Sequence, residues 1–89
     1  MPRVVLTHAV LDTERWLRGK PERAEAIESG SGSNVTDYVA EDGSNNVAVT
    51  ADVSDLAAMQ AMLASPPPEV LAGMEEHGVV PPVTAYIEA

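Results

Sequence analysis

Residues 45–53, NNVAVTADV, alternate with the period of two that predicts a β-strand. This strand is apolar on both sides, because Val47 and Val49 fall on one face and Ala48 falls on the other. Residues 3–10, RVVLTHAV, show the same pattern. A strand in a two-layer domain normally buries one face and exposes the other to water. We therefore expect a further layer to cover the second face of the sheet.

Residues 12–29 have the composition of a helix that is interrupted once. Asp12 or Thr13 can serve as the N-cap, because a short oxygen-bearing side chain accepts hydrogen bonds from the first turn. Gly19 weakens the pattern and Pro21 breaks it, since proline lacks a backbone donor. We expect a short helix followed directly by a second one.

A loop, a hairpin and a helix are expected to follow. Residues 30–34, GSGSN, favour a loop, and strands are predicted at 35–41 and 46–53 around the turn DGSN. Residues 54–65 predict a helix capped by Ser54, with apolar side chains at helical spacing.

The last quarter of the chain predicts one more helix and a strand. Ser65 can cap a helix whose first positions are prolines, and Gly78 can end it. The strand that follows contains Pro81 and Pro82, which cannot donate to a ladder and therefore belong at a strand start or on a sheet edge.

The resulting order, β–α–β–β–α–β, is that of a ferredoxin-like α+β fold. We expect residues 1–89 to form a single domain with a four-stranded antiparallel sheet, whose second helical element is split in two. Both helical elements would lie on one face. Because an apolar second face exceeds what monomers normally expose, we expect a second copy of the chain to cover it as a homodimer.

Charge and composition narrow the choice of partners and of compartment. The net charge is −9, which argues against nucleic acid and against an anionic membrane surface. All five basic residues lie in the first 23 positions, where they can pair with acidic neighbours or, alternatively, attract an anionic ligand. The chain has no cysteine and no run of about 20 apolar residues, so we expect a cytoplasmic protein without a membrane span.

Three stretches resemble the dimeric α/β-barrel superfamily, and within it small single-domain proteins of the antibiotic-biosynthesis-monooxygenase type. They are LTHAVLDTERW (6–16), VAVTADVSDLAAMQAMLASP (47–66) and MEEHGVVPP (74–82). The resemblance implies two facing sheets and a cavity for a small hydrophobic or aromatic molecule, without a cofactor. Members include cofactor-independent oxygenases, polyketide cyclases and haem-degrading enzymes. The Asn, Trp and Tyr set of the oxygenases has no position-by-position match in this chain.

His8 is the candidate catalytic residue, since it lies in an apolar strand and a pKa near 6.5 suits proton transfer. It can equally be a buried structural histidine. Trp16, Tyr38 and Tyr86 are candidates for substrate binding. His8 and His77 lack the spacing of metal ligands, so no metal site is expected.

Three functions remain open on the sequence alone. The first is a homodimer that binds a small hydrophobic or aromatic metabolite in a cavity between layers. The second is a cofactor-independent monooxygenase or cyclase with His8 as the proton-transfer residue. The third is a structural or regulatory homodimer whose barrel is filled by side chains.

Overall fold

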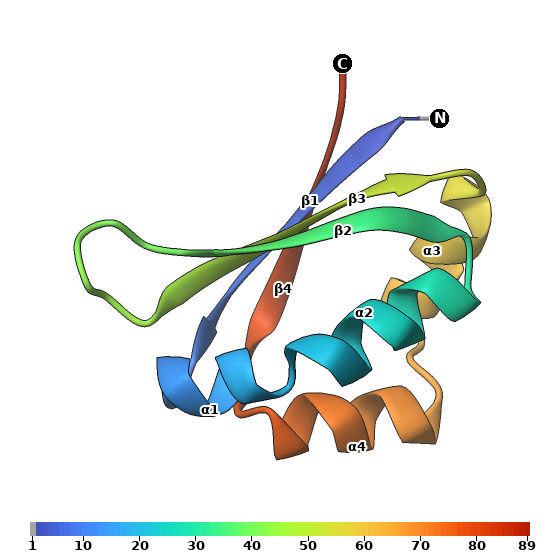
Figure 1. Ribbon diagram of the computed structural model, residues 1–89. Coiled ribbons are helices and arrows are strands. Elements are labelled where there is room, and N and C mark those ends of the chain that lie inside the picture. The colour runs from blue at the N-terminus through green and yellow to red at the C-terminus, as the bar shows by residue number, and fades with distance from the viewer. Residues whose placement is uncertain (1) are drawn as a thin grey trace.

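The computed structural model describes residues 2–89 and shows one antiparallel sheet with helices on a single face (Figure 1). Its strands follow the order β2-β3-β1-β4. The elements are β1 (Arg3–Val10), α1 (Thr13–Arg18), α2 (Lys20–Ser29), β2 (Gly32–Val39), β3 (Asn46–Val53), α3 (Leu56–Ala64), α4 (Pro68–Glu76) and β4 (Val79–Ile87). This confirms the ferredoxin-like α+β fold with a split second helical element.

The first helical element divides where the sequence predicted. The Asp12 carboxylate accepts hydrogen bonds from the backbone N–H groups of Glu14 (2.9 Å) and Arg15 (3.4 Å), which confirms it as the N-cap of α1. Gly19 separates α1 from α2, and Pro21 lies in the first turn of α2, where its missing N–H costs no helical hydrogen bond.

The loop predicted at residues 30–34 is wrong for its second half, because β2 begins at Gly32. Gly32 and Ser33 pair with Val53 and Asp52 of β3, so ladder hydrogen bonds outweigh the turn-like composition of this segment. A register shift follows between Ser33 and Thr36, and Asn34 adopts a positive φ of 58° within it. The strand predicted at 35–41 also ends earlier, at Val39.

The caps predicted for the next two helices are also corrected. Asp55, not Ser54, caps α3, because its carboxylate accepts the Ala58 N–H at 3.0 Å whereas the Ser54 hydroxyl bonds the Ser31 carbonyl. Ser65 ends α3, and α4 begins at Pro68 with Pro67 in the capping position.

Strand β4 forms one edge of the sheet, as its two prolines require. Pro81 and Pro82 occupy the segment where the pairing of β1 with β4 shifts register, between Thr7 and Ala9. The position at an edge that the prolines predicted is therefore confirmed.

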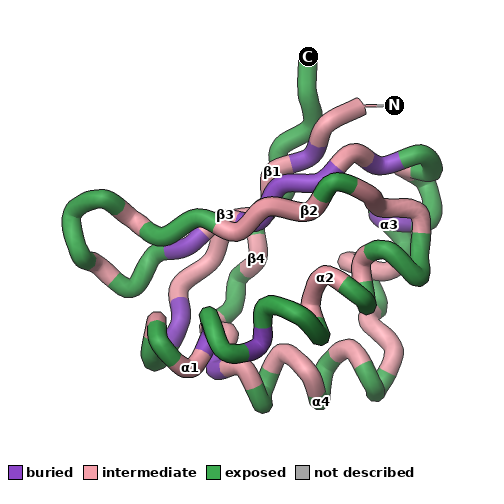
Figure 2. Tube along the Cα trace, in the orientation of Figure 1, coloured by how far each residue is buried: buried purple, intermediate pink, exposed green. Residues whose placement is uncertain are grey.

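The hydrophobic core lies between the sheet and the helices. Trp16 is fully buried at 0% exposure and packs with Val10, Val47 and Val49 near one end of the sheet. Met59 packs with Val4 and Val53 near the other end. Figure 2 shows this burial concentrated along β3 and β1, whereas the hairpin loop between β2 and β3 is largely exposed.

The second face of the sheet, called here the uncovered face, carries no helix (Figure 1). It is less apolar than expected, because the valines of β3 and of the ends of β1 point toward the helices. Cross-strand pairs share a face. By this rule the uncovered face carries Val5, Thr7, Thr36, Tyr38, Ala48, Thr50, Thr84 and Tyr86. The face is thus rich in threonine, with tyrosines at its edges.

No helix within residues 2–89 combines the length and the apolar character needed to cross a membrane.

Candidate functional site

A trough of about 520 Å³ lies on the sheet at the end where β2 and β3 are joined. Its lining comes from all four strands. The residues are Thr7, His8 and Ala9 of β1, Tyr38, Val39 and Ala40 at the end of β2, Asn46, Val47 and Ala48 of β3, and Val80, Pro81, Pro82 and Thr84 of β4.

The trough follows from side-chain size along one cross-strand row. Tyr38 pairs with Ala48, Ala48 with Thr7, and Thr7 with Thr84, so these four side chains stand on the uncovered face side by side. The two central side chains are short, whereas Tyr38 is long and 49% exposed. The row is therefore low in its middle and high at its β2 edge.

The chemistry of the trough is neutral. No Asp, Glu, Lys or Arg is among its described lining residues, although such residues make up 21% of the chain. Its polar lining residues are Thr7, Thr84 and Tyr38 with their hydroxyls, Asn46 with its amide, and His8. Such a surface suits an uncharged ring system that accepts or donates a few hydrogen bonds.

A charged cluster lies at the opposite end of the uncovered face. The Arg3 guanidinium donates to Asp52 Oδ1 at 3.1 Å and to the Thr50 hydroxyl at 2.9 Å. The Asn34 amide donates to the other Asp52 oxygen at 3.3 Å. Hydrogen bonds from Arg3 and then from Asn34 hold the pKa of the Asp52 carboxyl below its ordinary value.

The helix side of the sheet carries a second group of functional candidates. The rings of His8 and Trp16 meet edge to face, with centroids 6.0 Å apart. The Arg23 guanidinium lies 4.0 Å from the Trp16 ring centroid and is paired with Asp37, whose side chain is 2% exposed. Arg23 also donates to the Trp16 carbonyl at 3.1 Å.

The ring nitrogens of His8 and Trp16 determine which hydrogen bonds these two side chains can form. His8 Nδ1 lies 2.9 Å from the Ala9 carbonyl, which can only accept, so Nδ1 carries the proton of that bond and Nε2 is the basic nitrogen of the neutral ring. Trp16 Nε1 is buried and has no hydrogen-bond partner among residues 2–89. A buried indole N–H normally finds an acceptor.

The structure divides the four predicted site residues between the two faces. His8 and Trp16 come together on the helix side, because His8 pairs with Val47 of the Trp16 cluster. Tyr38 and Tyr86 stand on the uncovered face, in neighbouring cross-strand rows. His8 and Tyr38 nevertheless both belong to the lining of the trough, whereas Trp16 and Tyr86 do not, and the roles of all four residues remain predictions.

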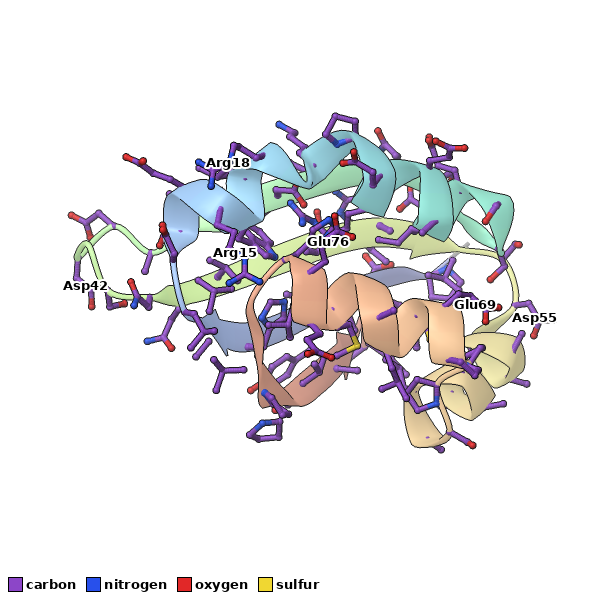
Figure 3. The ribbon with its side chains drawn as sticks, turned by 90° about the horizontal axis from the view of Figure 1, so that it is seen from below. Arg15, Arg18, Asp42, Asp55, Glu69 and Glu76 are labelled. Atoms are coloured by element: carbon purple, nitrogen blue, oxygen red, sulfur yellow. The ribbon has the colours of Figure 1, made fainter. Side chains whose placement is uncertain are left out.

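Arg3, Arg15 and Arg23 bond within the chain, which agrees with pairing inside the protein more than with a site for an anionic ligand. Arg15 reaches from α1 to the end of α4, where it donates to the carbonyls of Glu76 (2.7 Å) and Glu75 (2.9 Å) (Figure 3). The side chain of His77 lies against Gly19 and is half-buried. Within residues 2–89 no three His, Asp or Glu side chains gather in a way that could hold a metal ion.

Sequence reasoning missed Thr7, Ala48 and Thr84 as site residues. The alternation of β3 placed Ala48 on the face opposite Val47 and Val49, and that of β1 placed Thr7 opposite Leu6 and His8, which was the available signal. Thr84 could not be found this way, because its face depends on the register shift next to the prolines.

The fold matches solved structures over the whole chain. It aligns with a crystal structure of an antibiotic biosynthesis monooxygenase at a TM-score of 0.59 and 14% identity, covering 100% of this chain and 97% of the other. A candidate enzyme of the same kind from Deinococcus radiodurans gives 0.61 and 20%, with 100% and 92% covered. Another, from Nitrosomonas europaea, gives 0.65 and 11%, with 99% and 88% covered.

These similarities show that the chain has the fold of the antibiotic biosynthesis monooxygenase structures. The resemblance seen in the sequence is therefore confirmed for the fold. The sequence itself matches no protein-family model and no curated protein.

Proposed function

We propose that the chain forms a homodimer through its uncovered sheet faces and binds a small, uncharged aromatic molecule in the trough between them. The observation that carries the proposal is a trough that spans all four strands and has no charged residue in the lining that the structure describes. A second copy supplies the missing wall. Threonine hydroxyls in the floor favour a chamber with a ligand over a barrel packed with side chains, because buried hydroxyls need partners.

The homodimer is tested by light scattering during dilution through the micromolar range. We expect a molar mass about twice the 9.4 kDa of the chain. A chain that stays monomeric at every concentration would contradict the proposal, because the trough would then have only one wall.

Ligand binding is tested with 1,8-dihydroxyanthraquinone, a neutral planar probe, against anthraquinone-2-sulfonate as its charged counterpart. We expect the neutral probe to bind at least about tenfold more tightly, because the trough offers no cation to pair with a sulfonate. Ala48→Leu should weaken binding of the neutral probe by about tenfold, since the added carbons occupy the trough floor. Ala72→Leu on the exposed surface of α4 is the matched control and should leave binding unchanged. Equal affinity for the two probes, or no effect of Ala48→Leu, would argue against this site.

A second candidate function is a cofactor-independent oxygenase or cyclase in which His8 moves the proton. The observation that favours it is that His8 belongs to the lining of the trough and meets the Trp16 ring edge to face. His8 Nε2 would accept a proton from a phenol or enol. The test is turnover of 1,8-dihydroxyanthrone under oxygen by the wild-type chain and by His8→Ala. Unchanged turnover in His8→Ala would remove His8 from any mechanism.

A further inference from the structure

We infer that the troughs of the two subunits merge into a single chamber on the two-fold axis, which holds one ligand molecule for every two chains. This inference rests on the proposed homodimer and concerns how its two sheets are placed. In a two-fold interface, if residue i of one copy meets residue j of the other, j also meets i. The direction of the axis therefore decides which side chains face each other.

An axis that runs along the strands, between β1 and β3, places charges in complementary positions. It puts β3 of one copy over β1 of the other, and β2 over β4, without changing the height along the strands. Asp52 pairs with Arg3 within its own sheet. With this axis Asp52 also faces the partner's Arg3, and Arg3 faces the partner's Asp52. Sheets that pack face to face are about 10 Å apart, a gap that an arginine and an aspartate can bridge.

The same axis matches large side chains with small ones at both edges. Tyr38 of β2 shares a row with Thr84 of β4, and Thr36 of β2 lies in the next row, which ends at Tyr86. Tyr38 would therefore face the partner's Thr84, and Tyr86 would face the partner's Thr36. Each exposed tyrosine meets a short side chain, which lets the two sheets approach closely along both edges.

An axis that runs across the strands gives a poorer arrangement. Each strand would then lie over its own copy in reverse, so Arg3 would face either the partner's Arg3 or an uncharged position of β1 such as Thr7. The first case opposes like charges, and the second desolvates the ion pair without a counterpart. The charges on the uncovered face thus select the axis along the strands.

The shared chamber follows from where the trough lies. It extends over all four strands, so an axis between β1 and β3 passes through its middle and the partner's trough lies directly over it. Ala48 and Thr7 flank the axis and are short. The space above Ala48 and Thr7 joins the two troughs into one chamber. The two Tyr38 side chains, one from each subunit, close this chamber at its two opposite edges. A flat ring system on the axis occupies the space that both troughs share, so it excludes a second molecule from that position.

The axis is tested by charge reversal in trans. Arg3→Asp and Asp52→Arg each break the ion pair within the chain and place like charges over the partner, so each variant alone should form a dimer about tenfold or more weaker than wild type. An equimolar mixture should form heterodimers of near wild-type affinity, because each negative pair then faces a positive pair. Reversal of Glu69 and Lys20, which are exposed on the helix side, is the matched control and should not select heterodimers. A mixture that dimerises no better than its components would overturn the proposed axis.

The chamber is tested by titrating wild-type protein with 1,8-dihydroxyanthraquinone in a calorimeter, at protein concentrations where light scattering shows a dimer. We expect saturation at one probe molecule per two chains. The heterodimer formed by the Arg3→Asp and Asp52→Arg variants should saturate at the same ratio. Saturation at one molecule per chain would overturn the shared chamber while leaving the proposed function intact. Absence of dimer or of binding would instead overturn the proposed function itself.

Discussion

At the residue scale, Trp16 joins the apolar core to a buried ion pair. Arg23 stacks on the Trp16 ring and forms two hydrogen bonds with Asp37, through Nε at 3.1 Å and Nη2 at 3.2 Å. The side chains of Arg23 and Asp37 are 12% and 2% exposed, so the pair is largely shielded from solvent. A guanidinium placed over an indole gains from both the charge and the contact area.

Asp37→Ala should lower the free energy of unfolding by about 3–5 kcal/mol, because it leaves the Arg23 guanidinium buried without its counter-ion. Urea denaturation followed by Trp16 fluorescence measures the change. Glu28→Ala, at an exposed position of α2, is the control and should change stability by less than about 0.5 kcal/mol. A cost for Asp37→Ala as small as that of the control would show that the pair contributes only as a surface salt bridge does.

At the element scale, two glycines of the α4 region differ in whether the backbone needs them. Gly73 lies inside α4 in an ordinary helical position, whereas Gly78 follows α4 in a conformation that favours glycine. Gly78 has a φ of +73°, a left-handed conformation in which a β-carbon is strained, and its carbonyl accepts the Leu11 N–H at 2.9 Å. Gly73 lies inside α4, and a β-carbon there would meet no other atom within 4 Å. The glycine stop that the sequence predicted at 78 is thus confirmed by the backbone.

Alanine substitutions at these two glycines should have opposite signs. Gly78→Ala should destabilise the protein by about 1–2 kcal/mol through the left-handed conformation. Gly73→Ala should stabilise it by about 0.5–1 kcal/mol, because alanine loses less backbone entropy in a helix. Thermal unfolding of both variants gives the comparison. Two changes of the same sign would mean that α4 does not begin and end as described.

At the scale of the whole molecule, the uncovered face couples stability to pH. The pKa of the Asp52 carboxyl is held below its ordinary value by Arg3 and Asn34. A depressed carboxyl pKa stabilises the folded state fully above the unfolded pKa, about 3.9, and this contribution is lost as pH falls through the lower folded value.

Asp52→Asn should therefore remove part of the loss of stability that the wild-type protein shows below about pH 4. Urea midpoints measured on both proteins between neutral and acidic pH give the two slopes. Glu69→Gln, at an exposed position of α4, is the control and should keep the wild-type slope. If the slope of Asp52→Asn also equals that of wild type, Asp52 is not bonded in solution as the structure shows.

The sequence by itself determined the elements that depend on neighbours along the chain. The period-two pattern of β1 and β3, the cap at Asp12, the break at Gly19 and the stop at Gly78 were all readable, because capping, backbone conformation and alternation act over a few residues. The order of these elements was sufficient to predict a ferredoxin-like sheet with its helices on one face.

Only the tertiary structure decided what the second face of that sheet is. Strand pairing extended β2 back to Gly32 against its turn-like composition, and the register shift near Pro81 set the row in which Thr84 stands. Register is a relation between strands distant in sequence, so local pattern cannot supply it. It turned an expected apolar face into one with a threonine-lined trough at one end and an ion pair at the other, and it left Tyr86 outside the trough that His8 and Tyr38 line.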